Sequence, residues 1–171
     1  MALAERYAEH HMRTNGSLPL TLFMITPGGL GILGKESLAE AEKDYFADTA
    51  KLMCRAYAAT VIVLAAETWS APDRLDDKSG EIVPASKCPD RREMVLLMGE
   101  SRNEGQNHKQ LPILRSDDGK FSGFGKSEVS PGPMEGRFTH FLPTTPPDED
   151  TQRAVEAILK LKPSATGKLP E

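Results

Sequence analysis

The chain has 171 residues, of which 39% are hydrophobic and 27% charged, as expected for one folded domain and not for a coiled coil, a collagen-like repeat or a disordered chain. Its formal net charge is -4, so it lacks the basic excess that is typical of nucleic-acid-binding proteins. The longest apolar run, 61–66, is far shorter than the ~20 residues that cross a bilayer, and two cysteines make no disulfide framework. We therefore expect a cytoplasmic protein without an export signal, a membrane contact or a nucleic-acid partner.

The first half of the chain predicts two helices and two strands. Residues 2–14 have the apolar spacing of a short amphipathic helix, and 17–26 form an apolar run, bounded by Gly and Pro, that is typical of a strand. Residues 27–34 are rich in glycine and predict a loop. The strongest helical pattern covers 35–59, with acids early and bases late, as the helix dipole favours. The continuous apolar run at 60–69 predicts a central strand.

In the second half the hydrophobic pattern changes to a period of two. A polar segment with three prolines, 71–90, predicts a long loop, a feature that is often functional. Strands are predicted at 93–102, 109–115, 121–126 and 136–142, and turn residues such as Asp-Gly join the earlier ones. Strands that are joined by short turns indicate an antiparallel sheet.

A last helix is predicted over 146–162, with Thr145 as its cap and Pro146 at its first position. Residues 164–171 are expected to form a disordered tail, so that residues 1–163 make a single domain. The fold class that follows is α+β: a mostly antiparallel sheet of five or six strands, packed with two longer helices and one short N-terminal helix.

The sharpest motif lies in the glycine-rich segment 28–35, between a predicted strand and a predicted helix. It runs G-x-G-x-x-G-K, with Gly29, Gly31, Gly34 and Lys35. Backbone N–H groups and a helix N-terminus in this setting could bind a phosphate. However, Glu36 stands where a P-loop has Ser or Thr, and the later hairpins do not fit repeated βαβ units. A glycine-rich turn is therefore favoured, and nucleotide binding is a remote alternative.

A second group of residues surrounds the long loop, if strands 60–69 and 93–102 are neighbours. It consists of Glu67, Trp69, Asp90, Arg91, Arg92 and Glu93. The candidate catalytic residues of a metal- or anion-dependent hydrolase are Glu67, Asp90, Arg91 and Glu93; Trp69 and Arg92 are candidate ligand-binding residues. The reason is that arginines and carboxylates together can bind an anion or orient a metal-bound water. The commoner explanation is a structural ion-pair network that fixes the loop.

Signals for a metal, a cofactor or a nucleophile are poor. His10 and His11 are adjacent and point to different helix faces, while His108 and His140 lie far apart. No spacing of His and Cys is that of a metal site, so neither a metal nor a cofactor is expected. Cys54 lies within the predicted helix 35–59, where packing is its expected role.

Part of the chain resembles a loose group of uncharacterised bacterial and phage-encoded proteins. In that group an E-x-W strand end is followed by a P-D-R-x-E strand start, which here correspond to the runs AAETW and CPDRREMVLL. A hairpin and the run GRFTHFLP complete the pattern, which covers roughly residues 50–142. The resemblance implies one shared domain and carries no activity.

Two classes of function follow. The favoured one is a non-enzymatic binding or assembly protein that acts as a homo-oligomer, since no catalytic motif is clear and an open edge of the sheet would be available for pairing. The alternative is the hydrolase at the loop mouth. A homodimer is expected because strands 61–66 and 94–98 are apolar throughout and need cover on both faces. A monomer whose helices cover opposite faces is the alternative.

Overall fold

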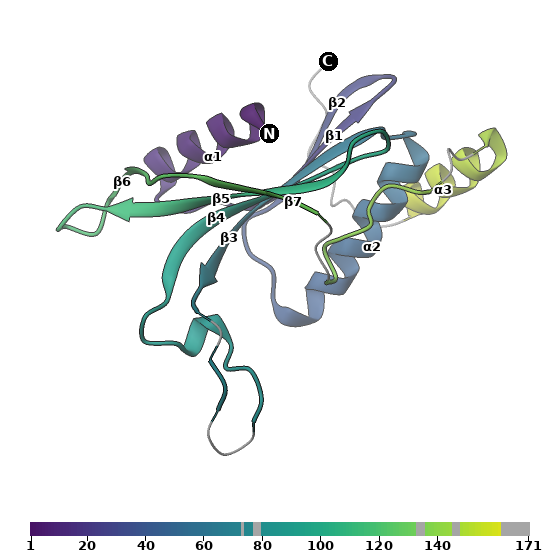
Figure 1. The fold of residues 1–171 in the computed structure, drawn as a ribbon. Helices are drawn as coiled ribbons and strands as arrows, with labels where there is room; N and C mark the ends of the chain where they lie inside the picture. The colour runs from purple at the N-terminus through teal and green to yellow at the C-terminus, as the bar shows by residue number, and fades with distance from the viewer. Residues whose placement is uncertain (73, 77–79, 133–135, 145–147, 162–171) are drawn as a thin grey trace.

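The structure is a computed structural model that describes residues 1–72, 74–76, 80–132, 136–144 and 148–161, with the backbone alone at 158, 159 and 161. The described residues form an α+β fold of three α-helices and one antiparallel sheet of seven strands (Figure 1). The helices are α1 (Ala2–Asn15), α2 (Glu40–Ala56) and α3 (Glu149–Leu161). The strands are β1 (Leu20–Thr26), β2 (Gly29–Lys35), β3 (Val61–Ser70), β4 (Arg92–Ser101), β5 (Gly105–Arg115), β6 (Phe121–Phe124) and β7 (Glu128–Pro131).

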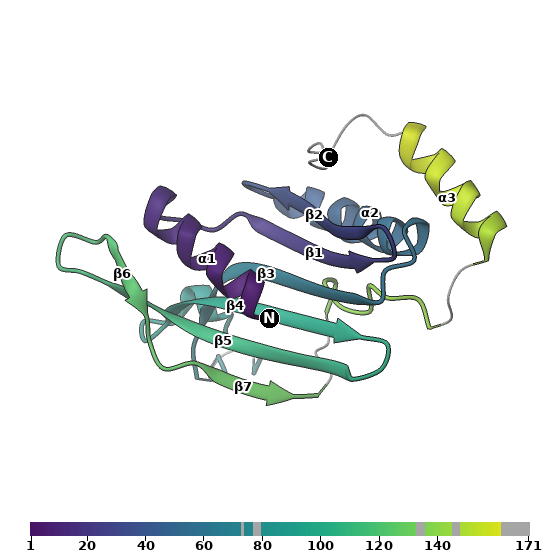
Figure 2. The same ribbon diagram turned by 90° about the horizontal axis from the view of Figure 1, so that it is seen from above.

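The sheet is ordered β2-β1-β3-β4-β5-β6. β7 also pairs with β5, so that β6 and β7 follow one another along the same side of that strand (Figure 2). β3 and β4 pair over their full length, from Val61 opposite Ser101 to Ser70 opposite Arg92. This pairing confirms that the two strands on either side of the long loop are neighbours.

Helix α1 covers one face of the sheet, where it lies over β3, β4 and β6 (Figure 2). Its small residues Ala4 and Ala8 are fully buried and bring the helix close to the sheet. Below them, Val95, Leu97 and Leu111 are at most 1% exposed and belong to the same apolar cluster. Burial of this continuous apolar surface is the main force that holds the α1 layer.

Helix α2 covers the other face, over β1 and β3 (Figure 1). Ala50 and Cys54 on its inner side are 0% exposed and pack in one cluster with Leu22, Ile62 and Leu64 of the sheet. Helix α3 packs against α2 rather than on the sheet. The chain is thus layered as α1, sheet and α2, so its own helices supply the cover on both faces of the central strands that we expected a partner subunit to provide.

The glycine-rich segment differs from the sequence prediction, because residues 29–35 form strand β2 and not a loop. A two-residue turn joins it to β1, with Thr26 opposite Gly29. Glycine is disfavoured in strands, so its frequency here argued for a loop. Because residues 29–35 belong to the hairpin, α2 is shorter than the helix predicted over 35–59. It begins at Glu40 and ends before Ala58, whose φ of 49° is left-handed.

The predicted strand at 136–142 is also wrong, because this segment has no strand pairing among the described residues. His140 has a φ of 56°, which an extended strand does not allow. The alternation of Phe138 and Leu142 that suggested a strand reflects packing of an irregular segment into the α2 cluster. A strand does occur at 128–131, between the strands predicted at 121–126 and 136–142, where the sequence is rich in Pro and Gly and predicts no strand.

The helix lengths also differ from the prediction. The N-terminal helix has 14 residues and α3 has 13, so the N-terminal helix is not the shortest. Asp148 stands before α3 and accepts the backbone N–H of Thr151 at 2.7 Å, a bond that holds the pKa of Asp148 below its usual value. The predicted cap Thr145, Pro146 and the tail 164–171 lie outside the described residues.

Candidate functional site

The loop mouth is the end of the β3–β4 pair, where residues 71–91 leave and return to the sheet. Trp69 lies opposite Glu93, and Ser70 opposite Arg92. Because side chains alternate along a strand, Glu67, Trp69 and Glu93 point to the α1 side of the sheet, whereas Arg92 points to the α2 side. The expected cluster is therefore divided between the two faces.

On the α1 side an arginine joins the two glutamates. Arg115, at the end of β5, forms an ion pair with Glu93 through Nε and lies 3.9 Å from Glu67 through Nη2. The second oxygen of Glu67 accepts the backbone N–H of Leu18 at 3.1 Å. All three charged side chains are 27–30% exposed, so water screens them only in part. Both carboxylates are thus occupied by partners within the chain.

The remaining loop-mouth residues form separate contacts. The guanidinium of Arg91 stacks over the ring of Trp69, 4.6 Å from its centre, and donates a hydrogen bond to the carbonyl of Ser86 at 2.8 Å. Asp90 pairs with Arg74 of the loop at 3.4 Å. The Arg91–Trp69 contact joins the loop to β3, whereas the contacts of Arg91 with Ser86 and of Asp90 with Arg74 lie within the loop.

Sequence reasoning missed Arg115, which completes this network. It lies 22 residues after Glu93, on the next hairpin. The position of Arg115 at the end of the strand predicted at 109–115 was visible in the sequence. Which residues of β4 this strand faces depends on the turn between the two strands, and the sequence does not define the geometry of that turn. Within the described part of the chain, no group of three or more His, Cys, Asp or Glu side chains could hold a metal ion.

The glycine-rich segment does not provide the setting that phosphate binding needs. Gly29, Gly31 and Gly34 lie in an extended strand paired with β1, and the strand does not lead directly into a helix. Lys35 is already paired with Glu42 at 2.6 Å, and this bond holds the pKa of Glu42 below its usual value. Glu40 and Glu42 in the first turn of α2 oppose an anion there.

The same strand and its neighbour β1 carry a group of exposed apolar side chains. Ile25 lies opposite Leu30 on the β1–β2 hairpin, with Ile32 next to them, and the three side chains are 45%, 42% and 42% exposed. We call them the β2 patch. They point to the α1 side of the sheet, beside the area that α1 covers (Figure 2). As far as the described residues go, no strand pairs with the outer edge of β2.

Comparison with protein-family models, with curated proteins and with solved structures gives no match. The resemblance noted for residues 50–142 therefore stays a prediction. No helix in the described ranges is both long and apolar enough to cross a membrane.

Proposed function

We propose that the protein is a non-enzymatic assembly protein that acts as a homodimer, in which β2 of one copy pairs with β2 of a second copy. The observation that carries this proposal is the outer edge of β2 with its apolar patch. Natural proteins protect edge strands with charges, prolines or bulges, because an open edge pairs with other chains. In β2 the only charged residue is Lys35, at its end, and proline is absent.

The hydrogen-bonding pattern of the hairpin selects one register for this pairing. The carbonyl of Ile25 accepts the N–H of Thr60, so the backbone of Ile25 points toward β3 and away from β2. Its neighbour in register, Leu30, then points its own N–H and C=O to the outer edge, as do Ile32 and Gly34. An antiparallel two-fold pair centred on Ile32 uses all of these groups and places Leu30 opposite Gly34.

This register also buries the β2 patch. The two Ile32 side chains lie side by side across the two-fold axis, and each Leu30 side chain extends over a glycine that leaves it room. The patches of the two copies become one apolar stripe on the α1 side of a continuous sheet. Burial of apolar area at ~25 cal/mol per Å² favours such an arrangement over exposure to water.

The first experiment places a charged side chain in the β2 patch. Ile32→Lys keeps an exposed side chain in the monomer but places two ammonium groups against each other in the dimer. We expect light scattering to give twice the chain mass for the wild type and the chain mass for Ile32→Lys. The control is Val129→Lys on β7, which is 65% exposed, lies at the opposite edge of the sheet from β2 and should leave the dimer intact. A wild-type protein that stays monomeric at all concentrations contradicts the proposal.

The register has its own test. Residues opposite each other in a hydrogen-bonded antiparallel pair have Cα atoms ~5.5 Å apart, which a disulfide can span. Mild oxidation should therefore cross-link Ile32→Cys and not Leu30→Cys. The native thiols Cys54 and Cys88 are both buried and do not compete. Cross-linking of Leu30→Cys alone would show that the copies pair in another register.

The proposed homodimer needs no cofactor, metal or nucleic acid, because the two copies of the chain form the β2–β2 contact by themselves. Its two cysteines are free and buried, which suits a reducing cytoplasm. For the hydrolase alternative, the pairing of Glu67 and Glu93 with Arg115 leaves no carboxylate of that pair available as a general base.

A further inference from the structure

A groove of about 580 Å³ lies between α2 and residues 140–143, away from both the β2 patch and the loop mouth. Its volume is within the range of ~300–1,000 Å³ that is usual for small-molecule sites. Leu52, Phe141 and Pro143 supply its apolar lining. The polar lining comes from Asp48, Lys51, Arg55 and His140.

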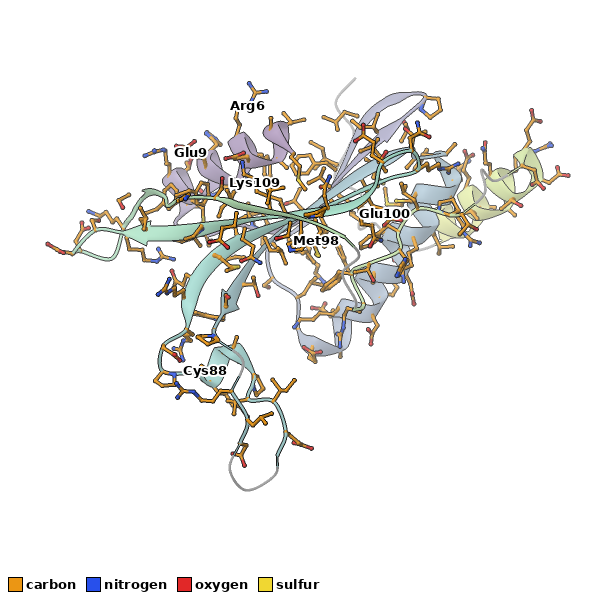
Figure 3. All side chains as sticks on the ribbon, in the orientation of Figure 1. Arg6, Glu9, Cys88, Met98, Glu100 and Lys109 are labelled. Carbon is orange, nitrogen blue, oxygen red and sulfur yellow. The ribbon has the colours of Figure 1, made fainter. Side chains whose placement is uncertain are left out.

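The wall opposite α2 is held in place by partly buried hydrogen bonds. Glu100 of β4 accepts the backbone N–H groups of Phe141 and Leu142 at 3.0 and 3.2 Å (Figure 3 labels Glu100). At the other end of the same segment, Arg137 pairs with Glu40 at 2.8 Å. The segment is therefore tied to both the sheet and α2.

The charges of the groove are unbalanced. Lys51 and Arg55 lie one helical turn apart on α2, and His140 is on the facing segment. Across the described ranges, these three side chains form no hydrogen bond or ion pair. Arg55 suits the negative end of the helix dipole, but this does not account for Lys51 or His140. Asp48 is the one acid among the lining residues that the structure describes.

The backbone at His140 is a second, independent observation. Its φ of 56° is a conformation that residues other than glycine rarely adopt, and such strain gathers at binding sites. The turn directs the chain so that His140 is exposed while Phe141 is 2% exposed. The segment thus presents a polar side chain at the rim and an apolar one in the wall.

We propose that this groove binds a small organic anion, a carboxylate with an aromatic or aliphatic body. The apolar lining takes the body, and Lys51, Arg55 and His140 take the anionic group. Unpaired cations around an apolar lining match an anion that carries an apolar part better than they match inorganic phosphate. A charge-assisted hydrogen bond is stronger than a neutral one, so the carboxylate should contribute most of the affinity.

The test uses a fluorescent organic anion, anilinonaphthalene sulfonate, displaced by phenylacetate. We expect phenylacetate to displace the dye and its neutral analogue phenylacetamide to fail, because only the first offers a negative charge. In Lys51→Glu/Arg55→Glu, dye affinity should fall at least ~10-fold. The matched control is Arg6→Glu/Lys126→Glu, which reverses the same charge on exposed residues that form no ion pair in the described ranges and should keep the affinity.

Two further measurements make the result decisive. Ile32→Lys should bind the dye as the wild type does, which separates the groove from the β2 patch. If the double charge reversal prevents folding, Lys51→Gln/Arg55→Gln tests the same contacts. Equal displacement by phenylacetamide, equal affinity of the groove and control variants, or loss of binding in Ile32→Lys would each overturn the proposal.

Discussion

The carboxylate of Glu100 accepts the backbone N–H of Phe141 at 3.0 Å and so joins β4 to a segment 41 residues later in the chain. A second oxygen of the same group accepts the N–H of Leu142. Phe141 and Leu142 are buried and Glu100 is partly buried, so water competes for these two bonds only in part. The side chain of Glu100 therefore holds the segment whose Phe141 and Leu142 pack into the apolar cluster between α2 and the sheet.

We expect Glu100→Ala to lower the free energy of unfolding by ~2–4 kcal/mol, since two buried N–H groups lose a charged acceptor. Glu100→Gln, which keeps one acceptor oxygen, should cost about half as much. Urea denaturation measures both. Glu104→Ala, in the exposed β4–β5 turn, is the control and should change stability by less than ~0.5 kcal/mol. Equal losses for Glu100→Ala and Glu104→Ala would exclude this role.

Arg115 should matter more than an ordinary surface arginine. Arg115→Met leaves Glu67 and Glu93 without their cation, and we expect a loss of ~1–2 kcal/mol that shrinks in concentrated salt. Adding Glu93→Gln to this variant should restore part of the stability. The comparison is Arg153→Met, whose ion pairs are exposed and should contribute within ~0.5 kcal/mol. A cost for Arg115→Met as small as that of Arg153→Met would show that the network contributes little.

The single tryptophan reports on the loop. In Arg91→Ala the ring of Trp69, already 39% exposed, loses the guanidinium that covers it. We expect its emission to move to longer wavelength and its quenching by acrylamide to increase. Arg92→Ala, next to it but on the other side of the sheet, should leave the emission unchanged. Identical spectra for both variants would mean that the stack does not persist in solution.

Burial raises the pKa of the Cys54 thiol to about 12. In the unfolded chain the thiol ionises at its ordinary pKa of ~8.5. Between these values the unfolded state loses a proton that the folded state keeps, so this contribution to stability is full below pH ~8 and falls as the pH rises. The stability advantage of the wild type over Cys54→Ala should therefore be smaller at pH 10 than at pH 8. Met53→Ala, a truncation without an ionisable group, should cost the same at both values.

The strands on either side of the long loop were predictable, because residues 61–66 of β3 and 94–98 of β4 are apolar throughout and are mostly buried on both faces of the sheet. The pattern of α2 was equally clear in its middle, although its ends were misplaced. β2 was missed because its three glycines favour a loop, and only the pairing with β1 makes them extended. The error at 136–142 has the opposite cause. Alternating apolar residues there pack around a turn at His140, and side-chain spacing alone does not reveal such a turn.

The site was predictable only in part. The position of Glu67, Trp69 and Glu93 at one sheet end followed once β3 and β4 were taken as neighbours. The contact of Arg115 with the two glutamates depends on the register of a third strand, which periodicity does not determine. The groove beside α2 joins residues 48–55 to 140–143, and no local pattern in the sequence links these two segments.

The position of α1 has a consequence for how the chain assembles. Glu5 pairs with Lys109 at 2.7 Å across 104 residues, and the apolar side of α1 rests on strands that come from β1 through β6. During synthesis this helix leaves the ribosome before the strands do, yet the surface that receives it is complete only after β6 has been made. An isolated helix of 14 residues is marginal in water, so α1 docks late in folding, after the hairpins of β3, β4 and β5. Pulse-labelled hydrogen exchange during refolding would show this order as protection in β4 before protection in α1, and the reverse order would contradict it.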